Sequence, residues 1–267
     1  MNDDVMIEVT GGVALVTLNR PEALNTFNYG VLEGLGAAYK RCDEDDEVRC
    51  VVVTGAGRVF CAGADLSGGG ETFDSSDRED ISSCPLAMQA WEVRKPVIAA
   101  CNGHAIGVGM GIAAQCDIRI VAEEGKYGFL QNRRGVVADF GMSWLLPRLV
   151  GFEKAFELLV RAQRMSGADV VEAGLASRCV PAQEVLQVAL EMAADYANNC
   201  APLVSGMHKR LLWKGLDSSF ESAVLDESLA LNHSMRKPDA LEGGVAYFEK
   251  RTPEWTGSVN KDWPEGL

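Results

Sequence analysis

Residues 95–111, KPVIAACNGHAIGVGMG, hold a strand-to-helix transition on which the predicted fold rests. The apolar run 97–101 is short and bounded by turn residues, which is typical of a buried strand. Asn102 and Gly103 then favour a turn, and the glycines beyond them predict a helix over 107–115.

A second segment, FCAGADL at residues 60–66, follows another predicted buried strand at 48–54 and a glycine turn. Small side chains let backbone N–H groups approach a ligand closely, and the first N–H groups of a helix have no internal partner. Two such groups converging on one point would stabilise an oxyanion. On pattern alone, however, these glycines are more typical of ordinary tight turns.

Strands and helices alternate in the remainder of the chain up to about residue 195, and only helix is expected beyond it. This order predicts an α/β core over residues 1–195 and a helical oligomerisation region over 196–267. A capping box at 218–221 and Pro238 are expected to open the last two helices. Residues 67–79 are expected to form a mobile loop. The other elements are strands at 13–18, 117–122 and 177–180, and helices at 28–41, 81–93, 141–149, 153–162, 167–173 and 183–199.

The charge and the cysteines exclude several functional classes. The 267 residues carry a formal net charge of -13, which argues against binding to nucleic acid or an anionic membrane. The 8 cysteines include no CxxC pair and no His at zinc spacing, so they predict buried thiols and no metal site. Without a secretory signal or a long apolar run, a cytoplasmic protein is expected.

Several motifs in series resemble the crotonase superfamily, the enoyl-CoA hydratase/isomerase family. The resemblance extends from Asn19 to about Trp255. It implies a spiral of ββα units, a C-terminal helical trimerisation region, and a homotrimer or a dimer of trimers. It further implies an acyl-CoA thioester substrate from fatty-acid or related metabolism, with no cofactor beyond the coenzyme A that the substrate carries. The motifs are FCAGADL, KPVIAACNGHAIGVGMG, CDIRIVAEEGKYGF, RRGVVADFGMSWLLPRLVG, GADVVEAGLASRCVP and FEKRTPEW.

The resemblance also assigns roles to particular positions. The N–H groups of Ala64 and Val108 would be the oxyanion donors. Lys250 or Arg251 would reach the phosphates of coenzyme A, although a solvated surface pair explains these two residues equally well. The coenzyme A channel would be lined by Ala23, Leu24, Ala62, Gly63, Asp65 and Leu66.

Both glutamates that a typical hydratase of this family uses are absent, because Gly111 and Gln131 stand at those positions. Asp139 resembles a carboxylate that is catalytic in some members, and a double-bond isomerase needs only one base. An apolar setting would raise the pKa of Asp139 toward neutrality. Asp139 could equally cap the helix at 141–149, and the two roles are compatible.

Other reactive side chains are expected to be structural. Cys61 is interpreted as a buried thiol and His104 as packing in a turn. Arg133 and Arg134 could contact a substrate carboxylate or a phosphate of coenzyme A, but internal ion pairs with the acidic surface are favoured. The leading hypothesis is therefore an enoyl-CoA isomerase, or a hydratase-like enzyme with a relocated carboxylate. The alternative is an acyl-CoA-binding protein with a structural or sensing role.

Overall fold

The computed structural model describes residues 3–69 and 82–267. A six-stranded sheet forms its centre, with strand order β1-β2-β3-β5-β7-β9. Only β1 and β2 are antiparallel, and every later neighbour is parallel. The strands are β1 (Val5–Thr10), β2 (Val13–Leu18), β3 (Cys50–Gly55), β5 (Val97–Cys101), β7 (Ile118–Ala122) and β9 (Arg178–Val180).

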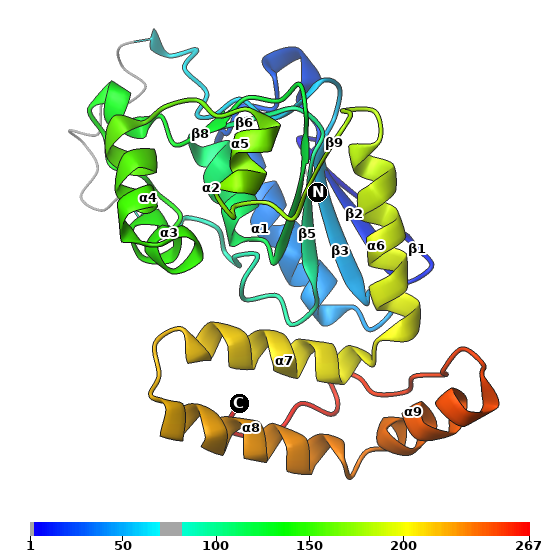
Figure 1. Ribbon diagram of the computed structural model, residues 1–267. Helices are drawn as coiled ribbons and strands as arrows, with labels where there is room; N and C mark the ends of the chain where they lie inside the picture. The colour runs from blue at the N-terminus through cyan, green and yellow to red at the C-terminus, as the bar shows by residue number, and fades with distance from the viewer. Residues whose placement is uncertain (1–2, 70–81) are drawn as a thin grey trace.

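Helices cover both faces of the central sheet, as Figure 1 shows for α1 (Tyr29–Glu44) and α6 (Val185–Asn199). Every residue of β3 is buried, because its side chains alternate between the two layers. Val51 and Val53 belong to the core cluster that contains α1. Val52 packs instead in a second cluster with the small side chains of α6, Ala189, Ala193 and Ala197.

A second, three-stranded parallel sheet, β4-β6-β8, continues the chain beyond the first. Its strands are β4 (Val59–Cys61), β6 (His104–Ile106) and β8 (Tyr127–Gly128). Each follows a strand of the central sheet in the chain, namely β3, β5 and β7. Parallel strands end at the same edge of a sheet, so the segments after β4, β6 and β8 come together there.

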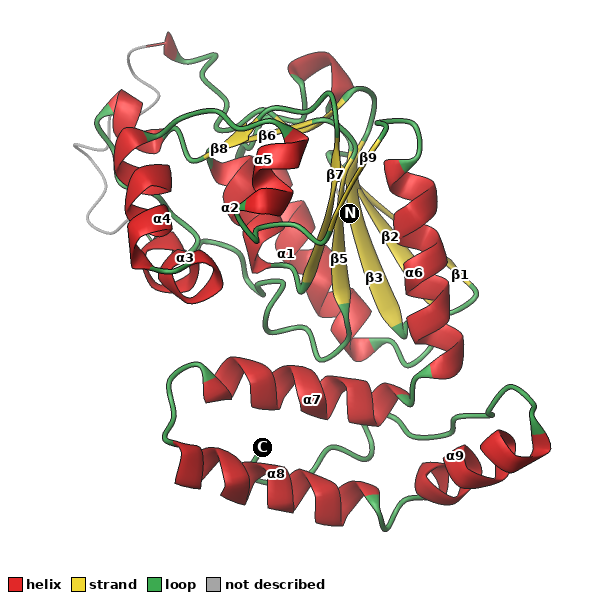
Figure 2. Ribbon diagram, in the orientation of Figure 1, coloured by secondary structure: helices red, strands yellow, loops and turns green. Residues whose placement is uncertain are grey.

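Most of the other regular structure in the described chain is helical, and the last three helices extend away from the sheets (Figure 2). This arrangement confirms the predicted α/β fold with a helical C-terminal region. The division at residue 195 falls within α6 and stays a prediction. These helices are α2 (Val108–Gln115), α3 (Met142–Val150), α4 (Phe152–Phe156) with a π-helical turn at Glu157–Arg161, α5 (Gly167–Glu172), α7 (Pro202–Gly215), α8 (Phe220–Ser234) and α9 (Pro238–Glu249).

The helix predicted at 81–93 is wrong for its described residues, 82–93, which form turns and bends. Side chains take the hydrogen bonds that a helix would need. The amide of Gln89 donates to the carbonyl of Leu86, and the carboxylate of Glu92 accepts from the N–H of Gln89. Such local side-chain bonds compete with helix formation.

Two smaller predictions concern the starts of α8 and α9. The cap of α8 is Ser219, whose hydroxyl accepts from the N–H of Ser222, so the predicted capping box at 218–221 is wrong by one residue. Pro238 opens α9 as predicted. Of the loop expected at 67–79, residues 70–79 lie outside the described part of the chain.

Candidate active site

The two predicted oxyanion segments lie side by side at the end of the smaller sheet. Ala64 follows β4 and Val108 is the first residue of α2 after β6. Both residues line one cavity of about 90 Å³. Within the described chain, neither N–H group has a hydrogen-bond acceptor. Two free donors at one small cavity are the arrangement that stabilises an oxyanion.

Glycines allow the two segments to approach each other. Gly63 has φ +111°, and a Cβ there would lie 3.2 Å from the carbonyl oxygen of Ile106. A Cβ on Gly109 would lie 2.5 Å from the carbonyl oxygen of Cys61, which no side chain could tolerate. The small residues in both motifs are therefore required by backbone packing around the cavity.

The predicted channel residues divide into two groups. Ala62, Gly63 and Leu66 line the same cavity as Ala64. Asp65 is instead hydrogen-bonded to Arg20 at 3.0 Å, and the bonds from Ser67 and Arg20 lower the pKa of Asp65 to about 2.

The loop that carries Ala23 and Leu24 docks beside the cavity. The N–H of Ala62 donates to the carbonyl of Leu24, and Arg20 bonds both Asp65 and the carbonyl of Thr26. Ala23 and Leu24 do not line the cavity itself. Their role along coenzyme A stays a prediction.

Asp139 lines the cavity and is half-buried. A tight turn brings Asp139 back to the cavity. The turn is a 3-10 helix that begins at Gln131 and ends at Gly135, which has φ +75°. Nε2 of Gln131 donates to Oδ1 of Asp139 at 3.1 Å. Burial raises the pKa of Asp139, in the direction expected from the sequence, while hydrogen bonds from its own backbone N–H and from Gln131 oppose the rise.

The side chain of Asp139 does not cap helix α3, so the predicted capping role is wrong. Helix α3 begins after Gly141, and no side chain caps it. The carboxylate of Asp139 is directed to Gln131, and only its backbone carbonyl accepts a hydrogen bond from the N–H of Met142. The side chain is therefore available for another function.

An aromatic ring lies against Gly111, the position at which the resemblance would place a glutamate. A Cβ on Gly111 would lie 3.2 Å from Cβ of Phe140 and 3.3 Å from its ring carbon Cδ2. Phe140 has φ +55°, which is strained for a residue with a Cβ. Its N–H donates to Ser83 and its carbonyl accepts from Gln115, so two hydrogen bonds hold this conformation.

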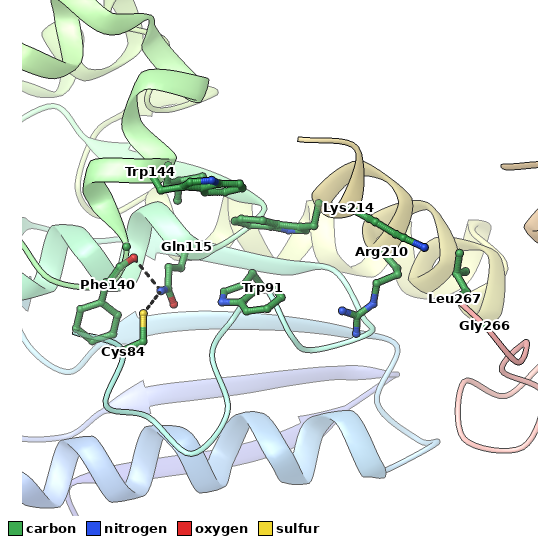
Figure 3. Close-up of a pocket in the computed structure, with 12 residues that line it drawn as sticks. Cys84, Trp91, Gln115, Phe140, Trp144, Arg210, Lys214, Gly266 and Leu267 are labelled. Atoms are coloured by element: carbon green, nitrogen blue, oxygen red, sulfur yellow. Dashed lines mark hydrogen bonds between the residues drawn. The ribbon is translucent and has the colours of Figure 1, made fainter. Parts of the chain in front are cut away.

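A second cavity, of about 610 Å³, begins at Phe140 and shares no lining residue with the oxyanion cavity. Three tryptophans, Trp91, Trp144 and Trp213, make it strongly aromatic. Figure 3 shows Cys84, Gln115 and Phe140 at one end of it, and Arg210 and Lys214 of α7 at the other.

Comparison with known proteins agrees with this geometry. The sequence profile described as enoyl-CoA hydratase/isomerase matches residues 8–258. The chain belongs to the enoyl-CoA hydratase/isomerase family. It is 35% identical to an enoyl-CoA hydratase of Alternaria alternata over 96% of this chain and 87% of that protein. It is 34% identical to a short-chain-enoyl-CoA hydratase of Clostridium acetobutylicum, over 94% of this chain and 97% of the relative.

Solved structures of the family superpose closely. A probable enoyl-CoA hydratase/isomerase from Mycobacterium abscessus matches with a TM-score of 0.92 and 44% identity, covering 95% of this chain and 99% of that one. An enoyl-CoA hydratase from Bacillus anthracis matches with a TM-score of 0.89 and 31% identity, covering 96% and 100% of the two chains.

Expectations for the other side chains have mixed outcomes. Cys61 is buried, and burial raises the pKa of its thiol to about 12, so it is the inert thiol that was predicted. Nδ1 of His104 accepts from the backbone N–H of Lys126, a structural contact. The guanidinium groups of Arg133 and Arg134 donate to the backbone carbonyls of Arg161 and Leu130, and neither forms an ion pair with another described residue, so the predicted ion pairs stay a prediction.

The C-terminal basic residues are not part of the cavity. Lys250 ends α9, which lies far from α2 in Figure 1. Arg251 forms ion pairs with Glu242 and Glu249. A contact between Lys250 and the phosphates of coenzyme A stays a prediction. No described helix has both the length and the apolar character to cross a membrane, and the described side chains form no cluster suited to a metal ion.

Sequence reasoning singled out only one of the other side chains that line the cavity, Arg134, which was considered for a substrate contact. Leu130, Val136, Val137 and Ile106 also line it. Their signal in the sequence was weak, because short segments between Gly and Asp show no periodicity. Only their neighbourhood to Gln131 and Asp139 could have indicated them.

Proposed function

We propose that this chain is an enoyl-CoA isomerase that moves a carbon–carbon double bond with a single acid/base, Asp139. The observation that supports this best is the composition of one cavity. It brings together two free backbone N–H groups, at Ala64 and Val108, and one half-buried carboxylate. Gly111 and Gln131 offer no second carboxylate there.

The reaction needs only these groups. The thioester oxygen of a 3-enoyl-CoA lies between the two N–H donors, and Asp139 removes a proton from C2. The charge spreads over the dienolate and is stabilised at the oxygen. Protonated Asp139 then returns the proton to C4, and the double bond lies between C2 and C3. One proton leaves and one returns, so no water or redox partner is consumed.

Hydration is disfavoured by the same geometry. A hydratase of the typical kind activates one water between two carboxylates, and the ring of Phe140 lies against Gly111 where the first would stand. The amide of Gln131 cannot accept and release a proton at neutral pH. The relatives named as hydratases therefore support the acyl-CoA chemistry, while the side chains of this site favour isomerisation.

Replacing Asp139 with Asn tests the proposal. Turnover of 3-enoyl-CoA thioesters, followed by the absorbance of the conjugated product, is expected to fall by about 10²–10⁴-fold, as is usual for the loss of a general acid–base. Asp195, an exposed aspartate of α6, gives the matched control Asp195→Asn, which is expected to keep full turnover.

Two outcomes would overturn it. Unchanged turnover in Asp139→Asn would remove Asp139 from the mechanism. Tight binding of enoyl-CoA esters with no turnover of either 3-enoyl-CoA or crotonyl-CoA by the native protein would favour the alternative, an acyl-CoA-binding protein with a structural or sensing role.

We also propose that the chain assembles as a homotrimer or a dimer of trimers. Exposed apolar side chains are concentrated on the C-terminal helices, and monomeric proteins rarely expose large apolar patches. Light scattering on the eluting peak of a gel-filtration column would give the mass directly, and a monomer would contradict the proposal. The side chains are Phe220, Leu225 and Leu231 of α8, and Leu241, Tyr247 and Phe248 of α9.

A further inference from the structure

Gln131 is buried in a way that folding alone does not explain. Its side chain lies at the start of the 3-10 helix that follows β8, and only 9% of the residue is exposed. Nε2 donates to Oδ1 of Asp139, but Oε1 is buried with no partner within the described chain. An unpartnered buried acceptor is unfavourable, whereas a methionine of similar shape would have no such atom.

The amide lies between the two functional parts of the cavity. A Cβ on Gly107 would lie 3.9 Å from Cδ and 4.0 Å from Nε2 of Gln131. Gly107 directly precedes Val108, whose N–H is one of the two free donors. Gln131 therefore lies beside Gly107 in the lining of the cavity and is hydrogen-bonded to Asp139.

The hydrogen bond distinguishes the two oxygens of the carboxylate. An amide N–H can only donate, so Oδ1 remains an acceptor whether or not Asp139 is protonated. The proton of the neutral acid is therefore carried by Oδ2. Within the described chain, Oδ2 has no side-chain partner.

We propose that Gln131 is the positioning residue of this site, which holds Oδ1 of Asp139 so that Oδ2 takes and returns the proton of the acyl chain. The inference rests on the proposed isomerase function. It explains why an amide stands where a typical hydratase has a glutamate. A second carboxylate about 3 Å from Asp139 would compete with it for one proton, whereas a neutral donor lets Asp139 ionise as a single group.

Among residues 3–69 and 82–267, few other titratable groups face Asp139. The thiols of Cys61 and Cys84 interact with its charge, but burial first, and the negative charge of Asp139 second, raise the pKa of both. They are neutral near pH 7. Arg134 lines the same cavity, and its guanidinium donates to the carbonyl of Leu130.

The test compares Gln131→Met with Gln89→Met. Gln89 is a matched control because it is also buried, its Nε2 bonds a backbone carbonyl, its Oε1 is also unpartnered, and it lines neither cavity. In Gln131→Met, kcat on 3-enoyl-CoA is expected to fall about 10- to 100-fold with KM changed by less than about threefold. The acid limb of the pH profile is expected to move up by about one to two pH units, because a hydrogen bond to the ionised form is lost.

Thermal unfolding separates this role from a structural one. The positioning role predicts a melting temperature for Gln131→Met that is unchanged or higher, since the orphaned Oε1 is removed. Gln131→Glu can donate to Oδ1 only while its own carboxyl is protonated, so its turnover is expected to come nearest to that of the native enzyme at acid pH. Gln89→Met is expected to leave the pH profile unchanged.

A titration of the Asp139 carboxyl carbon by NMR makes the test independent of turnover. A higher Asp139 pKa in Gln131→Met than in the native protein supports the inference even if the native protein isomerises none of the substrates, which would refute only the proposed function. An unchanged pKa and pH profile, or a large drop in melting temperature without a shift of the profile, would overturn the inference.

Discussion

The contact between Gly111 and Phe140 makes a quantitative prediction about stability. Replacing Gly111 with alanine adds a methyl group 3.2–3.3 Å from Cβ and the ring of Phe140. Carbon atoms in optimal contact lie about 3.5–4.0 Å apart, so the ring must move by a few tenths of an ångström. Overpacking of this kind costs about 1–3 kcal/mol, while alanine gains about 1 kcal/mol over glycine in a helix. The expected net change is a destabilisation of about 0–2 kcal/mol.

The assay is urea unfolding of a double-mutant cycle with Phe140→Gly, which removes both the ring and the Cβ that lies 3.2 Å from the added methyl group. In that background the helix-propensity gain of Gly111→Ala should prevail, so its effect is expected to change sign. Gly244 of α9 is a matched control, because a Cβ there meets nothing within 4 Å, and Gly244→Ala is expected to stabilise by about 1 kcal/mol. If Gly111→Ala stabilises the native background as much as Gly244→Ala does, the ring of Phe140 is not packed against Gly111.

Three further predictions concern the cavity and its surroundings. Because burial raises the pKa of Asp139, kcat/KM for isomerisation should fall as the pH drops through a value above the ordinary aspartate pKa of about 3.9. A pH profile of kcat/KM that stays flat down to pH 4 would contradict this. Arg20→Met removes the partner of Asp65 and loosens the loop that lies beside the cavity. Steady-state kinetics should then show a KM for the acyl-CoA that is about five- to tenfold higher, equivalent to about 1 kcal/mol, with kcat unchanged. An unchanged KM would refute the role of Arg20 in docking this loop. In the folded protein at pH 8, a thiol reagent should modify the exposed Cys84 and leave the buried Cys61 intact. Peptide mass spectrometry identifies the modified cysteine. Modification of Cys61 would contradict its burial and show that the segment after β4 opens.

Local signals were sufficient for most elements of the fold. The β-branched run of β3 and the helical spacing in α1 predicted both elements because their side chains enter the same core. The short strands of the smaller sheet, of two or three residues each, were missed. The sequence also predicted a helix at 82–93 that does not form, because the side chains of Gln89 and Glu92 take the place of backbone hydrogen bonds there. Segments this short carry no periodicity, and their pairing depends on strands distant in the chain.

The sequence by itself determined the small residues at Gly63 and Gly107 and the absence of carboxylates at 111 and 131. These follow from residue identity, because a glycine has no side chain and an amide does not titrate near pH 7. Only the tertiary structure decided where the side chains of Asp139 and Phe140 lie. The turn at Gly135 brings Asp139 back to Gln131 and away from the end of α3, and the strained backbone of Phe140 directs its ring against Gly111. Both outcomes depend on contacts across the cavity, which no pattern of neighbouring residues encodes.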